Sequence, residues 1–111
     1  EAARTLLDKN LIRPSVNRSY YAMFYAVLAL LAQGKKETSK HSGAIALFDR
    51  DFVKRGVFKK NYSRWLHDAF DLRQRSDYSA EYHASRKDAE TTLKNAETFV
   101  DEVNKVLSKE T

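Results

Sequence analysis

The sequence predicts an all-α protein, folded as an antiparallel up-and-down bundle of four or five helices. Only three Gly and one Pro interrupt the 111 residues, apolar residues recur at helical spacings of three and four, and the alternation typical of strands is hard to find. A chain of this length has room for one hydrophobic core, so residues 1–111 are expected to form a single domain.

The first helix is expected from about Ala2 to Asn10, with Leu6 and Leu7 facing inward. Because the chain opens on Glu1 rather than Met, we interpret this helix as the end of a longer one.

The second helix is expected to begin near Pro14 and to end at Gly34. Proline fits the first turn because the N–H that it lacks has no partner there, and glycine is the usual left-handed cap at the other end. The third helix is expected from about Ser39 to Arg50, after a Thr38/Ser39 cap. Its apolar side consists of Ala44, Ile45 and Phe48.

Residues 51–60 form a basic connector with room for one short helical turn, broken at Gly56. The fourth helix is expected from about Tyr62 to Arg75, and the fifth begins at a capping pair, Ser85 and Asp88. The apolar face of the fourth helix consists of Trp65, Leu66, Ala69, Phe70 and Leu72. The seam along the fifth, at spacings of four and three, consists of Ala89, Leu93, Ala96, Val100, Val103 and Leu107.

Composition excludes several chemistries. The chain has no cysteine, so disulfides, thiolate zinc sites and cysteine nucleophiles are ruled out, and a reducing cytoplasm is the expected location. No apolar run approaches the roughly 20 residues that a membrane span needs. Residues 35–64 carry nine Lys or Arg against three Asp or Glu, whereas residues 77–111 carry five against eight. The basic segment fits either a solvated surface or a place where phosphates collect.

Polar residues stand at the head of the second helix, in the stretch NRSYYAMFYA. Asn17, Tyr20, Tyr21 and Phe24 fall three or four apart and share one side of the helix, flanked by Arg18. An arginine close to a packed seam is costly unless it is paired, so Arg18 needs an acid. The alternative is that the tyrosines only form a hydrogen-bonded seam between helices.

The acid is expected in LRQRSDY, where Arg73 and Asp77 are four apart and Tyr78 follows. If the second and fourth helices are antiparallel neighbours, this stretch lies beside the start of the second helix. Arg18 then comes within ion-pair reach of Asp77 or Asp71. The predicted polar cluster either binds a ligand or serves only as a salt-bridge network that sets the register of the helices.

Familiar catalytic and metal-binding motifs are absent. His41, His67 and His83 lie in separate segments without the spacing of metal ligands, so no metal site and no cofactor are expected. There is no Gly-rich phosphate loop, no GxSxG and no pair of catalytic carboxylates. His41, in KHSG at a helix start, is the histidine best placed for an anion, although a capping or surface role fits it as well.

Four stretches taken together resemble the HEPN domain (higher eukaryotes and prokaryotes nucleotide-binding): NRSYYAMFYAVLALL, KHSGAIALFDRDFVKRG, AFDLRQRSDY and AETFVDEVNKVL in the closing helix. The resemblance is to the small stand-alone prokaryotic subfamily called UPF0332, and it covers nearly the whole chain. It implies an up-and-down helical bundle that forms a homodimer, often made beside a minimal nucleotidyltransferase as a toxin–antitoxin pair.

Many members of this family are metal-independent ribonucleases. Their signature is an Arg followed, after four to six residues, by a His, and two copies meet across the dimer to form the RNA-cleaving site. Arg73 matches the arginine of this signature, but Tyr78 stands five residues on and His83 stands ten residues on. The signature histidine is therefore missing from this chain.

By this resemblance, the candidate catalytic residues are Arg73, Asp77 and Tyr78. The candidate residues for binding RNA or a nucleotide are Asn17, Arg18, Tyr21, His41 and Arg75. One function that stays open is that of a toxin-type protein that binds RNA or a nucleotide in a polar cleft at a homodimer interface. Such a protein would also be a metal-independent endoribonuclease if the altered motif still supports cleavage. The other is a non-catalytic adaptor for a minimal nucleotidyltransferase, which receives a nucleotide on a tyrosine, Tyr78 first. A purely structural bundle is the third interpretation.

Overall fold

The computed structural model describes residues 2–36, 40–78 and 83–109. These ranges contain five α-helices and one π-helical turn and no strand, so the predicted all-α fold is confirmed. The elements are α1 (Ala2–Asp8), α2 (Ile12–Gln33), α3 (His41–Phe48), η1 (Asp49–Val53), α4 (Lys60–Tyr78) and α5 (Arg86–Lys109).

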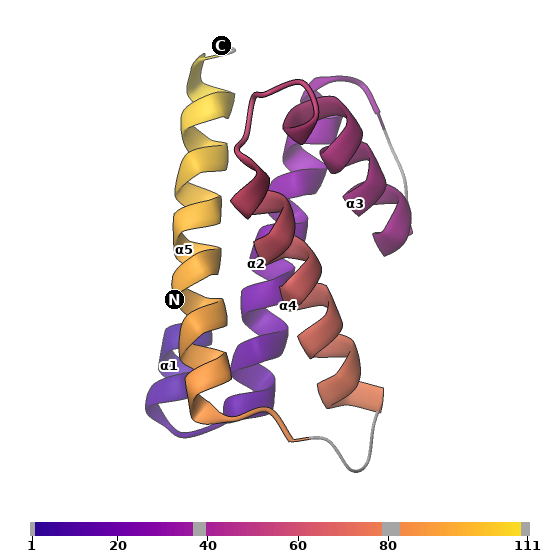
Figure 1. Ribbon diagram of the computed structural model, residues 1–111. Coiled ribbons are helices and arrows are strands. Elements are labelled where there is room, and N and C mark those ends of the chain that lie inside the picture. The colour runs from indigo at the N-terminus through magenta and orange to yellow at the C-terminus, as the bar shows by residue number, and fades with distance from the viewer. Residues whose placement is uncertain (1, 37–39, 79–82, 110–111) are drawn as a thin grey trace.

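The long helix α2 lies at the centre of the bundle and contacts each of the other α-helices. α4 runs antiparallel to α2 and to α5, whereas α2 and α5 point the same way (Figure 1). The antiparallel pairing of α2 with α4 brings the start of α2 beside the end of α4, as predicted. None of the helices in the described ranges is both long enough and apolar enough to cross a membrane.

The core is built mainly around the buried side of α2. Its apolar residues recur three or four positions apart, which places them on one face that α4 and α5 can cover. At the end of the core nearest η1, the buried rings of Phe48, Phe58 and Phe99 lie with their centroids 5.3–6.5 Å apart. Burying each such ring stabilises the fold by about 1.5–3 kcal/mol.

α2 and α4 are both longer than predicted. α2 begins at Ile12, so Pro14 is its third residue and still lies in the first turn, where a missing N–H leaves no bond unmade. α4 continues to Tyr78 instead of ending at Arg75. The stretch LRQRSDY is therefore the last part of a helix, and its first arginine and its aspartate are neighbours on one face.

The left-handed cap of α2 falls one residue later than predicted. Gly34 has φ −85°, and the residue with a left-handed φ, of 60°, is Lys35. The N–H of Lys36 donates to the carbonyl of Leu31 (2.8 Å) and the N–H of Lys35 donates to that of Ala32 (2.9 Å). These two bonds form a Schellman motif, so glycine marks the helix end but a lysine adopts the left-handed conformation.

α3 lies within its predicted limits, and the predicted Thr38/Ser39 cap falls outside the described residues. The π-helical turn η1 follows directly, close to where the connector was expected to hold a helical turn. The N–H of Lys54 donates to the carbonyl of Asp49 (2.8 Å), the i to i+5 bond of a π-helix. The Asp49 carboxylate accepts a hydrogen bond from Ser63 of α4 (2.7 Å), which ties η1 to α4.

The capping pair predicted for α5 is confirmed. The N–H of Ser85 donates to the Asp88 carboxylate (3.3 Å), and the N–H of Asp88 donates to the Ser85 hydroxyl (3.0 Å). The predicted seam needs correction, because Phe99 is fully buried whereas Val100 and Leu107 are only half-buried. α5 packs against α1, α2 and α4, so its buried face is wider than a seam for one partner helix.

Candidate functional site

An open groove of about 420 Å³ lies where the start of α2 meets the end of α4. Its lining residues are Arg13, Pro14, Asn17, Arg18 and Asp77. The groove exists because the two helices are antiparallel, so that residues at opposite ends of their sequences lie side by side. Three of the five lining side chains can donate hydrogen bonds, which suits an anionic ligand.

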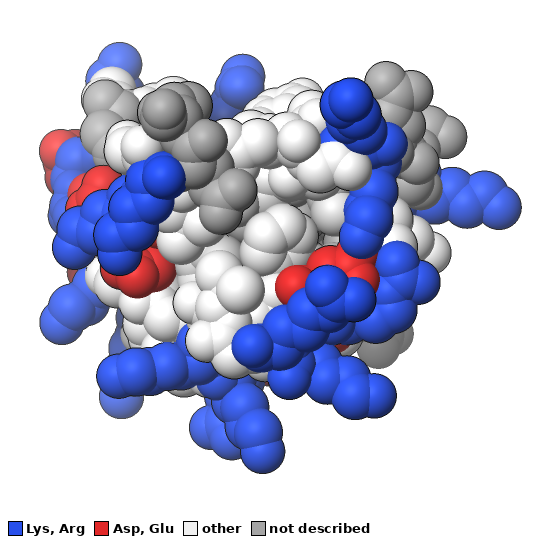
Figure 2. All heavy atoms as spheres, turned by 90° about the horizontal axis from the view of Figure 1, so that it is seen from above, with Lys and Arg blue, Asp and Glu red and all other residues white. Residues whose placement is uncertain are grey.

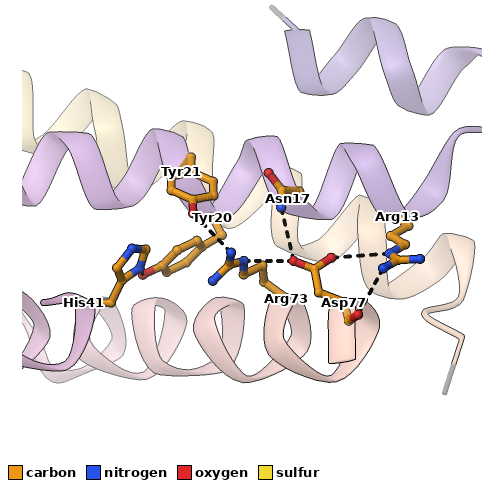
Figure 3. Close-up of polar contacts among 7 residues, drawn as sticks. All are labelled: Arg13, Asn17, Tyr20, Tyr21, His41, Arg73 and Asp77. Carbon is orange, nitrogen blue, oxygen red and sulfur yellow. Dashed lines mark hydrogen bonds and ion pairs between the residues drawn. The ribbon is translucent and has the colours of Figure 1, made fainter. Parts of the chain in front are cut away.

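The Asp77 carboxylate lies between Arg13 and Asn17 of α2 and Arg73 of α4 (Figure 3). Arg13 donates through Nε to Asp77 Oδ1 (3.3 Å) and through NH2 to the Asp77 carbonyl (3.1 Å), and Asn17 donates to Oδ2 (3.4 Å). From the same helix, Arg73 Nε lies 3.1 Å from Asp77 Oδ2 as an i,i+4 ion pair. Two arginines thus share one carboxylate, and the cluster keeps a net positive charge.

The predicted ion pair of Arg18 with Asp77 or Asp71 is wrong. Arg18 is exposed and forms no hydrogen bond or ion pair with residues in the described ranges. Arg13 takes the place that was expected for it, because Arg13 lies one turn before Asn17 on the same side of α2. Arg18 therefore adds a further, unneutralised positive charge to the wall of the groove.

Arg73 is held among aromatic rings. Its NH2 donates to the Tyr21 hydroxyl (3.1 Å), and its guanidinium carbon lies 5.2 Å from the ring centroid of Tyr21, 5.8 Å from that of Tyr20 and 5.9 Å from that of Tyr78. Each distance is within the range of a cation–π interaction. The Arg73 side chain is only 15% exposed, whereas Tyr78 is 76% exposed. The guanidinium is therefore oriented by the protein beside an open aromatic ring.

His41 joins the cluster through Tyr20. The buried Tyr20 hydroxyl lies 2.6 Å from His41 Nδ1, and the His41 ring stacks on Phe24 with centroids 4.2 Å apart. Burial raises the pKa of Tyr20 far above its ordinary value, so this hydroxyl keeps its proton. Among the described residues His41 Nδ1 is its only hydrogen-bond partner, so donation to Nδ1 satisfies both groups and leaves the imidazole proton on Nε2.

The charge state of His41 follows from the same surroundings. Partial burial, and then the nearby positive charge of Arg73, hold the pKa of His41 below its ordinary value. The imidazole is therefore neutral at neutral pH. With Nδ1 occupied by Tyr20, its Nε2–H is a donor that makes no hydrogen bond with the described part of the chain.

The structure brings most of the predicted site residues together. The groove and its border contain Asn17, Arg18, Tyr21, Arg73, Asp77 and Tyr78, and His41 is connected to them through Tyr20. Arg75 is placed elsewhere, because it is turned about 200° from Arg73 around α4. It lines a separate cleft of about 280 Å³ between α4 and α5.

Arg13 lines the groove and binds Asp77 but is not among the site residues predicted from the sequence. Arg13 lies four residues before Asn17, a spacing that places both on one side of a helix. This could not be used because the helix was predicted to begin at Pro14, after Arg13, whereas α2 begins at Ile12. The role of Tyr20 as the partner of His41 also goes unpredicted, because it depends on how α3 packs against α2. No group of three or more His, Cys, Asp or Glu side chains that could hold a metal occurs among the residues that the structure describes.

Comparison with known proteins gives a consistent result. A family model described as HEPN domain matches residues 1–106. A protein of Thermotoga maritima named UPF0332 protein is 35% identical over 105 residues, which cover 95% of this chain and 80% of that protein. A protein of Methanocaldococcus jannaschii named "putative toxin" is 35% identical over 106 residues, 96% of this chain and 78% of that protein. A UPF0332 protein of Gloeobacter violaceus is 39% identical over 101 residues, 90% of this chain and 80% of that protein.

Proposed function

Because this chain belongs to the HEPN domain family, we propose that it is a toxin-type protein of that family, which binds the phosphates of RNA or of a nucleotide in the groove between α2 and α4. The toxin class is supported by the names of two similar proteins of Methanocaldococcus jannaschii. The binding role rests on one observation: two arginines share the single carboxylate of Asp77, and Arg18 stands unpaired beside them among the described residues.

Five residues of the groove and its surroundings have distinct proposed roles. Arg73 offers a planar, always-charged fork to phosphate oxygens, and Arg18 adds a second cation at the groove wall. Asp77 positions the arginines, because both of its oxygens already accept hydrogen bonds or an ion pair. His41 offers its Nε2–H to a further oxygen. Tyr78 offers an exposed ring on which a base can stack.

Binding, rather than cleavage, is the activity that these residues support. In the ribonuclease reaction of the family, an arginine stabilises the charge of the phosphate and a histidine moves protons. This chain has Tyr78 where the resemblance places the histidine, and a neutral phenol lacks the basic ring nitrogen with which an imidazole accepts a proton. Incubation with RNA in EDTA decides whether the chain also cleaves.

The proposed assembly is a homodimer formed through α2 and α4. Small and aromatic residues follow the exposed side of α2 at spacings of three and four: Ala22, Tyr25, Ala29 and Ala32. Tyr25 is 62% exposed, and its ring lies 5.8 Å from that of Tyr21, which contacts Arg73. This surface therefore continues into the groove, and a two-fold dimer on it would bring two grooves together.

One observation favours a second function, that of a partner for a nucleotidyltransferase. Tyr78 is the most exposed large hydrophobic residue in the described ranges, and it carries a hydroxyl. The guanidinium carbon of Arg73 lies 5.9 Å from the centroid of the Tyr78 ring. A nucleotide phosphate held by Arg73 would lie close to this hydroxyl. Incubation with a nucleotidyltransferase and ATP, followed by mass spectrometry, would reveal an added nucleotide, and Tyr78→Phe would abolish it.

The test of the leading proposal compares the wild type with Arg73→Ala. Binding of single-stranded RNA and of ATP is measured by fluorescence anisotropy, and mixed RNA is incubated with the protein in EDTA. Removal of one charge-assisted hydrogen bond is expected to cost about 1.5–3 kcal/mol of binding free energy. Arg4→Ala is the matched control, because Arg4 is an exposed arginine paired with Glu97 and lies outside the groove.

The outcomes separate the interpretations. RNA cleavage in EDTA that disappears in Arg73→Ala would identify a metal-independent ribonuclease. Weaker binding without cleavage in either protein would identify a binding protein. If Arg73→Ala binds both ligands like the wild type while its melting temperature falls, the cluster is a structural lock between helices and the proposal is wrong.

A further inference from the structure

A second concentration of positive charge lies at the end of the bundle where α2 stops and α4 begins. Six exposed Lys and Arg side chains there form no hydrogen bond or ion pair with any described residue. We call them the basic cap; they are Lys35, Lys54, Arg55, Lys59, Lys60 and Arg64. Figure 2, which looks down on this end of the molecule, shows Lys and Arg side chains spread around a paler centre with few acidic groups.

The two described carboxylates of residues 40–64 have partners outside the basic cap. Asp49 is engaged by Ser63 (2.7 Å) and His67 (2.6 Å), and Asp51 is engaged by Lys36 and Arg50. These contacts tie η1 to its neighbours and leave no described acid of residues 40–64 for the cap. Arg4 and Arg86, which lie on other elements, do have carboxylate partners, in the ion pairs Arg4–Glu97 and Arg86–Glu90.

The geometry relates the cap to the groove. Lys60 and Arg73 stand on the same helix, 13 positions apart, which corresponds to about 20 Å along its axis. Successive phosphates of a stacked strand are about 3.4 Å apart along the axis, so about six nucleotides span this distance. Arg64 and Arg73 are turned about 180° from one another around α4, so the path over the surface is longer than the axial distance.

We propose that the basic cap is a second contact for the backbone of the same RNA strand that binds in the groove. This inference rests on the proposed function of the groove and adds the class of substrate: single-stranded RNA long enough to reach both places, rather than a mononucleotide. The cap binds phosphates without reading bases, because its four lysines and two arginines supply charge and no contact with a described residue fixes the geometry of these side chains.

RNA fits the cap better than an acidic protein does. A protein interface has an apolar, desolvated centre with aromatic residues. Among the described residues of 35–64, the only large apolar side chain that is exposed is Val57, at 48%. The cap is thus almost wholly charge, which is what the backbone of a nucleic acid requires.

The test measures binding of oligouridylates of two lengths, about 4 and about 16 nucleotides, chosen on either side of the six-nucleotide span. The cap variant is Lys54→Ala/Arg55→Ala/Lys59→Ala, and the matched control is Lys9→Ala/Lys87→Ala/Lys94→Ala, which also removes three exposed cations without partners among the described residues. Fluorescence anisotropy at several salt concentrations gives affinity and salt slope for each protein.

The cap variant is expected to bind the long RNA at least about tenfold more weakly at low salt, with a salt slope smaller by about 0.7 for each phosphate that the variant no longer neutralises. Its binding of the short RNA should stay within about twofold of the wild type, because the short strand cannot reach the cap. Equal decreases in affinity in the cap variant and in the matched control would overturn the proposal, as would a decrease that is independent of RNA length.

Two further measurements distinguish a failure of the basic cap from a failure of the groove, and RNA from an acidic protein as the ligand of the cap. If Arg73→Ala binds the short RNA like the wild type, the proposed function of the groove fails, whatever the cap does. If Arg73→Ala weakens short-RNA binding and the cap variant leaves long-RNA binding unchanged, only the inference about the cap fails. Poly-L-glutamate that competes as strongly as the long RNA, with the same dependence on the cap, would assign this surface to an acidic protein and overturn the proposal.

Discussion

Asp77 shows at the scale of single residues what could be predicted and what could not. Its pairing with Arg73 was predictable, because residues four apart on a helix are neighbours whatever the rest of the chain does. Its pairing with Arg13 was not, since that contact depends on where α2 begins and how α2 and α4 are aligned. Because α2 was predicted to begin near Pro14 and not at Ile12, the prediction paired Asp77 with Arg18 and left Arg13 outside the helix.

The pKa of His41 provides a residue-scale prediction. Partial burial and the charge of Arg73 lower it in the folded protein, whereas in the unfolded chain it takes its ordinary value of about 6.5. Between these two values the unfolded state binds the proton more readily, so the free energy of unfolding falls as the pH drops through this window. Arg73→Gln should raise the pKa of His41, and burial should keep it below 6.5.

Titration of the His41 ring followed by NMR measures both effects. Arg73→Lys is the control, because it keeps a positive charge near the imidazole and should leave the pKa low. A wild-type His41 that titrates at or above 6.5 would contradict the environment described here. A pKa that is equal in the wild type and in Arg73→Gln would mean that Arg73 contributes nothing to it.

At the scale of elements, the sequence predicts the capping pair of α5 correctly but does not predict which residues of α5 are buried. The capping pair of α5 was predictable because Ser85 and Asp88 satisfy each other within one turn. The burial of Phe99 instead of Val100 depends on several neighbouring helices, which no spacing within α5 reveals. The π-helical turn η1 is likewise determined by contacts with other segments, such as the bond from Ser63 to Asp49.

The end of α2 leads to a prediction at this scale. Lys35 has φ 60°, and relieving a left-handed conformation with Lys35→Gly should raise the free energy of unfolding by about 0.5–1 kcal/mol. Gly34 has φ −85°, and a Cβ there would meet the Leu31 carbonyl at an ordinary 3.6 Å. Gly34→Ala should therefore be stabilising by about 0.4–1 kcal/mol through the unfolded chain.

Urea unfolding of both variants and of the wild type measures these differences. The two effects should add in Gly34→Ala/Lys35→Gly only if the Schellman motif is kept, because the two residues are adjacent and share it. Destabilisation by Gly34→Ala would mean that Gly34, and not Lys35, adopts the left-handed conformation.

At the scale of the whole molecule, the exposed side of α2 bears on assembly. The proposed homodimer uses the aromatic and small residues around Tyr25, which is 62% exposed. Tyr25→Glu should place a charge at the centre of that interface and shift the protein to monomer in sedimentation velocity at micromolar concentrations. Val57→Glu is the control, because Val57 is also exposed but lies at the basic end of the bundle.

A monomeric wild type over the whole concentration range would refute the dimer. A wild-type dimer that persists in Tyr25→Glu and dissociates in Val57→Glu would move the interface to the other end of the molecule. Either result would be independent of RNA binding, because sedimentation is measured without a ligand.

The central place of α2 also has a consequence for the order of folding. α2 packs on α5, yet residues 34–85 separate the two helices along the chain. Joining them closes a long loop, which slows folding relative to a bundle whose contacts are all between successive helices. We expect the rate-limiting step to be the arrival of α5 on a pre-formed pair of α1 and α2. Val103→Ala in α5 should then slow refolding measured by stopped flow, whereas Ala44→Gly in α3 should mainly speed unfolding.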